Sequence, residues 1–272
     1  MINNVIITGG LGNQMFQYAF ALALRHRGFN VKIDISLYNM VKMHNGCELF
    51  TIFDIDEKPI NKKGIHVLFL RFLLKFKPSS LIRMDTVRYD LDNLLTEKHF
   101  FSGVWLSENY FKNIEEQIRK EFQFKNIDSR NITIAQEMQN CNSVSVHIRR
   151  GDYVAWGISL LGYEYYAQAI KTIKDKVDNL KFYFFSDDVD VAKEIAGHFN
   201  IEYNIINHNK GSNSYQDMFL MSQCKHNIIA NSSFSWWGAW LNNNIEKIVV
   251  APKEWVGGDD LHHPQLNTWT LI

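Results

Sequence analysis

Residues 144–154 read Val-Ser-Val-His-Ile-Arg-Arg-Gly-Asp-Tyr-Val. Alternating apolar side chains in the first half of this stretch predict a buried strand over residues 143–148. The end of the strand carries a cluster of polar side chains: His147, Arg149, Arg150, Asp152 and Tyr153. Ligands of open α/β sheets bind at the carboxyl ends of strands, and adjacent arginines match the geometry of phosphate oxygens. The stretch therefore predicts a phosphate site, with a solvated surface turn as the simpler alternative.

The chain beyond this stretch alternates between strands and helices. Strands are predicted over 143–148, 182–185, 201–206, 227–230 and 247–250, and helices over 163–177, 189–199, 215–224 and from 231 to about 241. Such alternation is typical of a doubly wound parallel sheet.

Parallel strands bring their carboxyl ends to one edge of a sheet, so polar groups that follow different strands should meet there. Ser186, Asp187 and Asp188 follow one strand, and the Asn231-Ser232-Ser233 run follows another. Arginines beside a serine-rich helix N-terminus suit a diphosphate, and a carboxylate accepts paired hydrogen bonds from guanine or a sugar diol. The alternative is that the serines and aspartates only cap helices.

The first half of the chain begins in the same way. A strand over 4–8 leads through Gly9-Gly10-Leu11-Gly12-Asn13-Gln14 into a helix from Met15 to Arg27, which Gly28 ends. A second strand over 30–36 has Asp34 at its far end. A strand, a glycine turn and a helix form a phosphate-binding βα unit, or simply a tight turn, because neither a dinucleotide fingerprint nor a Walker A loop is present.

The polar segment 128–142 separates the two halves. We expect the domain boundary there, with an N-terminal domain over 1–138 and a C-terminal domain over 139–272. Lys and Arg together number 29, as do Asp and Glu, so the formal net charge is zero. This balance argues against nucleic acid as a partner.

The three cysteines are scattered, which fits a reducing compartment better than a disulfide framework. No secretory signal and no apolar run of roughly 18–20 residues is visible, so we expect a cytoplasmic protein without a transmembrane segment.

Residues 62–77 contain a helical apolar stripe. The stripe consists of Ile65, Leu68, Phe69, Phe72, Leu73 and Phe76, and basic residues such as Arg71 and Lys75 occupy the other side. We expect this helix to pack its stripe on its own core. The alternative is a basic amphipathic helix resting on the inner face of an anionic membrane, which would make the protein peripheral there.

The metal question rests on few residues. The pair Asp187-Asp188 is similar to the Asp-x-Asp pair that holds a divalent ion on a sugar nucleotide. Arg149 and Arg150 already supply positive charge, so we predict a metal-independent site without a cofactor. His262-His263 could bind a metal, although an exposed tail is the simpler interpretation.

Four ordered motifs carry a family resemblance. They are Gly9-Gly10-Leu11-Gly12-Asn13-Gln14-Met15-Phe16-Gln17-Tyr18, His147-Ile148-Arg149-Arg150-Gly151-Asp152-Tyr153, Phe184-Phe185-Ser186-Asp187-Asp188 and Asn231-Ser232-Ser233-Phe234-Ser235-Trp236-Trp237-Gly238. With these motifs the chain resembles the bacterial α-1,2-fucosyltransferases of glycosyltransferase family 11. The resemblance implies a GT-B-like α/β fold, in which two Rossmann-type domains face each other across a cleft. It also implies GDP-β-L-fucose as donor.

The resemblance implies roles for individual residues. Arg149 should hold the donor diphosphate, Arg150 should support the donor or the fold, and His147 and Asp217 should lie by the guanine. Asn13 should reach the β-phosphate and fucose. The full donor-binding set implied is Gly10, Gly12, Asn13, His147, Arg149, Arg150, Asp187, Asp217, Asn231, Ser232, Ser233 and Phe234, and the catalytic set is Arg149, Asp152 and Asn13.

The catalytic base does not carry over from related enzymes. Similar α-1,6-fucosyltransferases have a glutamate ten residues after the histidine, where this chain has Gly157. Asp152 could deprotonate the acceptor hydroxyl, or departure of GDP stabilised by Arg149 could proceed without a strong base. A further alternative is that Asp152 is structural and locks Arg150.

We therefore expect an inverting galactoside 2-α-L-fucosyltransferase that moves fucose to the 2-hydroxyl of a terminal β-galactoside. The acceptor would be an oligosaccharide or a lipid-linked glycan. Two alternatives are a GDP-sugar transferase with another linkage or sugar, and a non-catalytic nucleotide-binding protein on the same fold.

Overall fold

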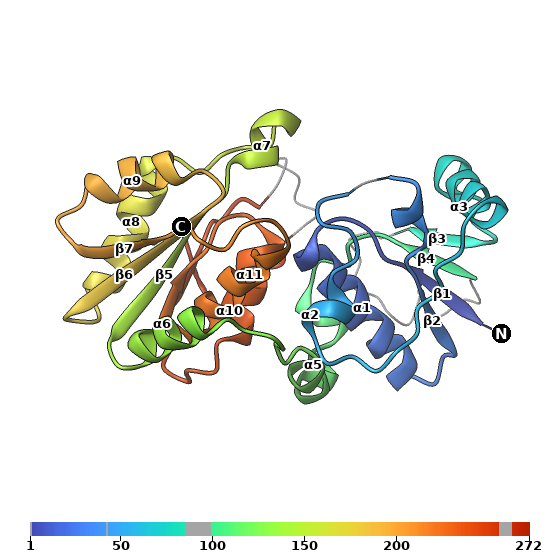
Figure 1. Ribbon diagram of the computed structural model, residues 1–272, viewed down its shortest axis with the longest axis horizontal. Coiled ribbons are helices and arrows are strands. Elements are labelled where there is room, and N and C mark those ends of the chain that lie inside the picture. Colours follow the sequence, from blue (N-terminus) through green and yellow to red (C-terminus); the bar gives the residue numbers. More distant parts are fainter. Residues whose placement is uncertain (1, 42, 85–98, 256–262) are drawn as a thin grey trace. The chain divides into compact units, whose positions relative to one another are not determined.

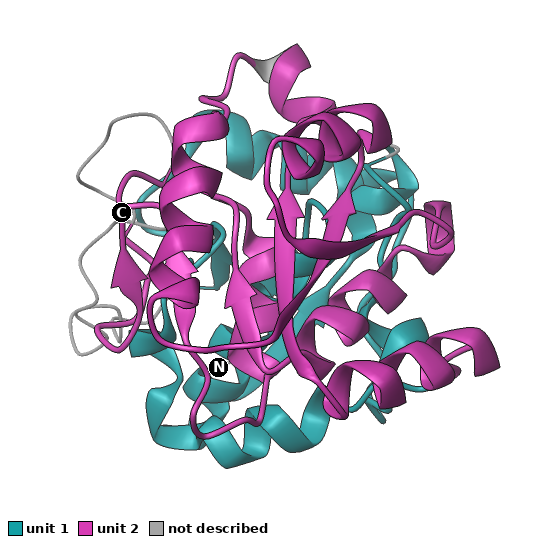
Figure 2. Ribbon diagram, turned by 90° about the vertical axis from the view of Figure 1, so that its left-hand side faces the viewer, with its two compact units in different colours: residues 1–125 teal, residues 126–272 magenta. Residues whose placement is uncertain are grey.

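The computed structural model describes residues 2–41, 43–84, 99–255 and 263–272. It divides into two compact units, residues 1–125 and 126–272 (Figures 1 and 2). Each unit contains a parallel sheet with helices packed on it, so the α/β class predicted from the sequence is confirmed.

The first unit has a four-stranded sheet in the order β2-β1-β4-β3, in which every pairing is parallel. Its elements are β1 (Asn3–Ile6), α1 (Leu11–His26), β2 (Val31–Asp34), η1 (Ser36–Asn39), α2 (Leu49–Ile52), α3 (Ile65–Phe76), β3 (Ile82–Met84), β4 (Phe100–Ser102), η2 (Glu108–Tyr110), η3 (Lys112–Ile114) and α5 (Glu115–Glu121).

Helix α1 begins at Leu11, four residues earlier than the sequence predicts, and Gly28 follows its end with φ of 89°. A left-handed residue after a helix is most readily glycine, so this part of the prediction is confirmed. The inner face of α1 packs on aromatic rings: Phe20 stacks on Trp105 with centroids 3.9 Å apart. Phe20 and Trp105 are both fully buried, so this stacked pair forms part of the core of the unit.

The expectation that the apolar stripe of residues 62–77 packs on the core is wrong. Of that stripe only Leu73 is buried, while α3 turns Val67 and Leu70 toward Ile6 and Ile82 instead. The helix is apolar on nearly every side, so a stripe in its sequence does not tell which side faces inward. The rest of the stripe is exposed.

The second unit has a six-stranded parallel sheet in the order β10-β9-β8-β5-β6-β7. Its elements are α6 (Ser129–Gln139), β5 (Asn142–Ile148), α7 (Gly151–Trp156), α8 (Tyr163–Lys174), β6 (Leu180–Ser186), α9 (Val189–Gly197), β7 (Glu202–Ile206), η4 (Gly211–Asn213), α10 (Tyr215–Gln223), β8 (His226–Ile228), α11 (Ser233–Leu241), β9 (Val249–Ala251) and β10 (Thr270–Leu271).

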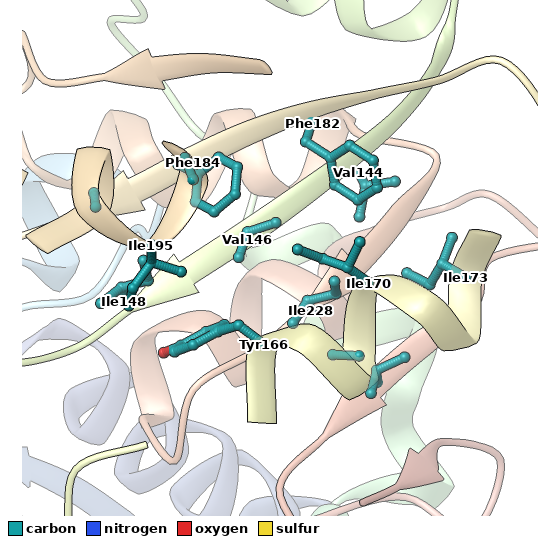
Figure 3. Close-up of a cluster of buried hydrophobic side chains, with 14 residues drawn as sticks. Val144, Val146, Ile148, Tyr166, Ile170, Ile173, Phe182, Phe184, Ile195 and Ile228 are labelled. Carbon is teal, nitrogen blue, oxygen red and sulfur yellow. The ribbon is translucent and has the colours of Figure 1, made fainter. Parts of the chain in front are cut away.

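Helices cover both faces of this sheet. One face packs on α8 and α9 through a cluster that includes Val146, Phe184 and Ile170 (Figure 3). The other face packs on α6 and α10 through residues such as Phe185 and Met221. Successive side chains of a strand point to opposite faces, and burying each apolar one contributes roughly 1.5–3 kcal/mol.

The division between units lies at residues 125/126, thirteen residues before the predicted boundary at 138/139. The polar segment over 128–142 is largely the helix α6, which the sequence analysis did not assign. Because its buried Ala135 and Met138 pack with β6 and α10, α6 belongs to the second unit.

Candidate active site

The second sheet changes its winding direction between β5 and β8. From β5 the chain adds β6 and β7 on one side, and it then returns to add β8, β9 and β10 on the other. Neighbouring strands at such a switch point leave a crevice outside their carboxyl ends. Arg149 follows β5 at this place, and Asn231 lies shortly after β8.

Arg149 is held between two carboxylates. Its Nη2 lies 2.6 Å from Asp152 Oδ1, and its Nη1 lies 2.9 Å from Asp187 Oδ2. The guanidinium carbon lies 5.5 Å from the centre of the Tyr153 ring, which packs beside it. The Arg149 guanidinium is therefore fixed by residues from three places: the end of β5, the start of α7 and the end of β6. Polar groups that follow β5 and β6 thus meet, as the sequence predicts.

The predicted alternative that Asp152 locks Arg150 is wrong, because Asp152 pairs with Arg149. Arg150 instead donates its backbone N–H to Asp187 Oδ1 at 2.9 Å, and its Nε lies 3.8 Å from Asp188 Oδ2. A Cβ atom on Gly151 would lie 2.5 Å from Asp187 Oδ2. Glycine is thus required at this position by the close approach of the carboxylate.

His147 lies buried at the end of β5, with its ring 5.9 Å from the ring of Phe234. Burial and, to a smaller extent, the charge of Arg149 together lower the pKa of His147 to about 3, so the imidazole is neutral. Its Nδ1 has no hydrogen-bond partner among the described residues, and neither do the Nε atoms of Arg149 and Arg150. Buried polar atoms without a partner are rare in folded proteins, so these nitrogens are available to a ligand.

The N-terminus of α11 lies beside β8. Ser232 caps the helix by accepting the backbone N–H of Phe234 at 3.3 Å. Asn231 donates to the carbonyl of Ser159 at 3.0 Å, and its own carbonyl accepts the Tyr153 hydroxyl at 2.8 Å. Ser233 begins the helix, and the positive end of a helix dipole favours an anion.

Asp188 caps α9 by accepting the N–H of Val191 at 3.2 Å, which confirms the capping alternative for the second aspartate of the pair. Asp187 does not cap the helix in this way. Its two carboxylate oxygens accept from Arg149 and from the backbone of Arg150.

Asp217 lies in the first turn of α10 and is half-buried. Burial raises its pKa to about 7, although a hydrogen bond at 2.8 Å from Asn209 partly offsets this rise. Asn131 continues the network by donating to Asn209 and to Gln216, at 2.9 and 2.8 Å. A helix that follows β7 begins at the carboxyl edge of the parallel sheet, so Asp217 shares that edge with His147 and Arg149.

Sequence reasoning missed the buried amides that support Asp217. Asn131 and Asn209 stand in no motif, and an isolated asparagine in a polar segment carries no signal that it is buried. Their packing with Gln216 becomes visible only in three dimensions.

The glycine turn of the first unit is tied down by side chains of its own unit. Gly9, with φ of 80°, accepts the Tyr38 hydroxyl at 2.6 Å and the Gln14 amide at 2.9 Å. Gly10 is the N-cap of α1, and Gly12 and Asn13 lie in its first turn, so these three predicted residues share one helix N-terminus.

The described ranges contain neither a cluster of metal ligands nor a helix that could span a membrane. No group of three or more His, Cys, Asp or Glu side chains there could hold a metal ion, and His262 lies outside those ranges. Metal independence stays a prediction. In the same part of the chain, no helix has both the length and the apolar character needed to cross a bilayer.

The chain is similar to known proteins over nearly its whole length. The profile of glycosyl transferase family 11 matches residues 1–270. An α-1,2-colitosyltransferase of Escherichia coli is 35% identical over 98% of this chain and 97% of its own. The O-antigen biosynthesis glycosyltransferase WbnK of Escherichia coli is 32% identical over 97% and 98%. The human galactoside α-(1,2)-fucosyltransferase 1 is 23% identical over 86% of this chain and 63% of its own.

Solved structures show the same fold. The NodZ α-1,6-fucosyltransferase co-crystallised with GDP superposes with a TM-score of 0.56 at 16% identity, covering 88% of this chain and 92% of that one. An Escherichia coli ADP-heptose heptosyltransferase II has a TM-score of 0.51 at 12% identity, covering 100% and 90%. These likenesses confirm the GT-B-type class, and with the family match they lead to one conclusion: the chain is a glycosyltransferase that belongs to glycosyl transferase family 11.

Proposed function

We propose that this enzyme transfers L-fucose from GDP-β-L-fucose to the 2-hydroxyl of a terminal β-galactoside, with inversion. The observation that carries the proposal is the Arg149 fork, which Asp152 and Asp187 hold at the switch point of the sheet. Beside it lies a buried neutral histidine, whose Nδ1 has no hydrogen-bond partner in the part of the chain that the structure describes. An arginine fork positioned before ligand arrives costs little to order when the ligand binds.

The donor would span the carboxyl edge of the second sheet. Its guanine would donate paired hydrogen bonds to the carboxylate of Asp217, with His147 and Phe234 close to the nucleoside. Its diphosphate would contact Arg149, Arg150 and the N-terminus of α11 at Ser232 and Ser233. In this proposal Asp187 and Asn231 do not contact the donor themselves. Asp187 holds Arg149, and Asn231 holds the loop at Ser159.

The chemical step breaks the bond between the fucose anomeric carbon and the β-phosphate oxygen. The galactose O2 forms a new bond to that carbon from the opposite face, so the β donor becomes an α-fucoside. GDP leaves with the electron pair, and Arg149 and the α11 N–H groups stabilise its added charge. The hydroxyl proton leaves to solvent on the acceptor side.

We assign Asp152 a positioning role in this step. Its Oδ1 accepts a hydrogen bond of 2.6 Å from Arg149 Nη2, so this oxygen already serves to orient the guanidinium. Asp152→Asn should therefore raise the KM for GDP-fucose by about tenfold and change kcat by less than about threefold. If Asp152 were the base, kcat would fall by about 10²–10⁴ with little change in KM, and the acidic limb of the kcat profile would disappear.

The first unit supplies the remaining predicted residues. We propose that Asn13, with Gly10 and Gly12 beside it, contacts the β-phosphate and fucose. The acceptor would bind mainly to this N-terminal domain.

Colitose is the second candidate sugar, favoured by the 35% identity to a colitosyltransferase. Colitose is fucose without its 3-hydroxyl group. A site that hydrogen-bonds the 3-hydroxyl rejects colitose by roughly 10⁴-fold, whereas a site built for colitose rejects fucose by only roughly 10²-fold. The ratio of kcat/KM for the two donors therefore distinguishes the two specificities.

The test is a transfer assay with GDP-fucose and GDP-colitose, lactose and a Galβ1,3-linked disaccharide as acceptors, followed by linkage analysis. A 2-linked α-fucoside as the favoured product supports the proposal. A strong preference for GDP-colitose, or another linkage, replaces it with the corresponding alternative. GDP binding without transfer to any galactoside would point to a non-catalytic nucleotide-binding protein.

A parallel arm contains EDTA. We propose that no metal or cofactor is required, because Arg149 and Arg150 supply the counter-charge, so transfer should proceed equally well with the chelator. Loss of transfer with EDTA, restored by a divalent cation, would make Asp187 and Asp188 candidate metal ligands. We also propose a cytoplasmic location, which the free thiols Cys47, Cys141 and Cys224 support.

A further inference from the structure

Helix α3 presents a large apolar face to solvent. Ile65, Leu68, Phe72 and Phe76 are 85%, 58%, 50% and 60% exposed, and Phe69 on the same side is 39% exposed. Monomeric soluble proteins rarely leave side chains of this size together on the surface, and such patches mark interaction sites. We call these five residues the α3 patch.

The rest of the first unit holds α3 so that the α3 patch faces outward. Val67, Leu70 and Leu73 on the opposite side are buried in the cluster with Ile6 and Ile82. At the start of the helix, His66 Nε2 lies 2.7 Å from the fully buried carboxylate of Asp34 at the end of β2. The helix therefore cannot rotate to bury the α3 patch without losing its own core contacts.

Neighbouring residues enlarge the apolar surface. Arg71 on α3 donates from Nη1 toward the sulfur of Met40 at 3.8 Å, which brings the end of η1 beside the helix. Met40 and Val41 are 42% and 53% exposed. Apolar side chains from two segments thus gather around one arginine.

Positive charge surrounds the α3 patch. Between residues 62 and 77 the sequence has Lys62, Lys63, Arg71, Lys75 and Lys77 and no acidic residue, in a chain whose formal net charge is zero. Each lysine or arginine near an anionic lipid surface adds to the attraction, and large apolar side chains insert at the boundary between headgroups and acyl chains. A partner that matches this surface must be apolar at its centre and negative around it.

We propose that the α3 patch docks the enzyme on an anionic lipid bilayer. The helix lies in the plane of the interface, its aromatic and aliphatic side chains enter the acyl boundary, and its cations pair with lipid phosphates. At 12 residues, α3 is too short to span a membrane, which requires about 20 residues. The contact is therefore peripheral, and it holds independently of the sugar that the enzyme transfers.

The experiment measures co-sedimentation with vesicles of phosphatidylcholine alone and of phosphatidylcholine with about 30% phosphatidylglycerol. We expect the native protein to bind the anionic vesicles, with binding weakened in about 0.5 M salt. Leu68→Ser/Phe72→Ser and Arg71→Glu/Lys75→Glu should each lower the partition coefficient by at least about tenfold.

Matched controls separate this surface from general surface chemistry. Lys171→Glu/Lys193→Glu makes the same charge change at exposed lysines of α8 and α9, and Ile132→Ser/Ile245→Ser removes two other exposed isoleucines. Both controls should bind vesicles as the native protein does. All four variants should keep the native unfolding temperature and the native rate with a soluble acceptor, because only exposed side chains change.

Three results would overturn the proposal. The first is native protein that stays unbound in the presence of anionic vesicles. The second is equal loss of binding in the α3 variants and their controls. The third is a lipid-free dimer that Leu68→Ser/Phe72→Ser converts to a monomer in sedimentation velocity, because the α3 patch would then bind a second copy of the chain.

Discussion

The glycine turn before α1 and the residues at the end of β5 each lie at the end of a parallel strand, yet their polar side chains differ in hydrogen bonding. At the glycine turn, Gln14 donates to the carbonyls of Gly9 and Gly46 and accepts the N–H of Glu48. At the end of β5, His147 Nδ1 and Arg149 Nε remain unpartnered within the described residues. The side chains of the first region bond to their own unit, whereas the second leaves nitrogens that the proposed donor could reach.

This difference teaches how to separate a structural motif from a binding one when both have the same local form. Gln17 repeats the behaviour of Gln14, because it accepts from the N–H of Thr8 and donates to the carbonyl of Gly103. Such amides stabilise folding and leave little for a substrate. We therefore expect substitutions in the two regions to change different quantities, and the following experiments test that separation.

The largest effect should come from Arg149→Lys. Lysine keeps the positive charge but cannot bridge Asp152, Asp187 and a phosphate with one planar fork. We expect kcat/KM to fall by about 10³-fold, equivalent to about 4 kcal/mol of transition-state stabilisation. Steady-state kinetics with GDP-fucose measures the loss.

Arg25→Lys is the matched control, because Arg25 also forms a two-pronged ion pair, with Glu57 of the first unit. It should lower stability and leave kcat/KM within about twofold of the native value. Equal loss of activity in the two variants would show that turnover depends on the Arg25 ion pair as much as on the Arg149 ion pairs. The end of β5 would then have no specific role in catalysis.

The second effect should be on stability. Gln14→Met removes three hydrogen bonds of a fully buried side chain and leaves backbone groups at Gly46 and Glu48 unsatisfied. We expect a loss of about 3 kcal/mol in the free energy of unfolding, measured by urea denaturation. The KM for the donor should hardly change in the folded fraction.

Asn13→Ala is the companion variant at the adjacent position. If Asn13 contacts the donor as proposed, kcat should fall by about 10²-fold while stability changes by less than about 1 kcal/mol. If Asn13→Ala lowered stability and Gln14→Met lowered kcat, the assignment of Gln14 to stability and of Asn13 to donor contact would be wrong.

The third effect is a pH dependence from Asp217, whose pKa burial raises to about 7. In the proposed site guanine binds the ionised carboxylate, so the KM for GDP-fucose should rise toward tenfold for each pH unit below 7 and level off above about pH 8. His147, with a pKa of about 3, stays neutral over this range. Asp217→Asn should have a high KM that does not vary between pH 6 and pH 8.

The same group links pH to stability with a known sign. The pKa of Asp217 is raised above its ordinary value of 3.8, so the folded protein binds the proton more tightly than the unfolded chain does. Its contribution to stability is complete below pH 3.8 and is lost as the pH rises to about 7. Without donor, Asp217→Asn should therefore unfold several degrees above the native protein at pH 8, a gap that narrows toward pH 5 and that differential scanning calorimetry measures.

Much of the second unit could be predicted from the sequence, because its strands are short apolar runs that end in polar residues. The alternation that placed Val146 on one face and His147 on the other is local and readable. The pairing of Arg149 with Asp152 and Asp187 could not be predicted from the sequence. Either of two adjacent arginines could pair with a nearby carboxylate, and only the direction of the backbone decides which one does.

The first unit was less readable for a different physical reason. Helix α3 is apolar on both its core face and its exposed face, so Leu68 and Leu70 look alike in the sequence although only Leu70 is buried. Periodicity indicates a helix, but it identifies the inner face only when the outer face is polar.

The smallest effect should come from the two helix caps. Ser232 accepts the N–H of Phe234 at the start of α11, and Ser107 accepts the N–H of Asn109 at the start of η2. Replacing either serine by alanine should cost about 1 kcal/mol in the free energy of unfolding. Only Ser232→Ala should also weaken GDP binding, by about threefold to tenfold in isothermal titration calorimetry, because its helix N-terminus is the one proposed to bind phosphate. Equal GDP affinity in the two variants would reduce Ser232 to a cap and move the diphosphate toward the arginines alone.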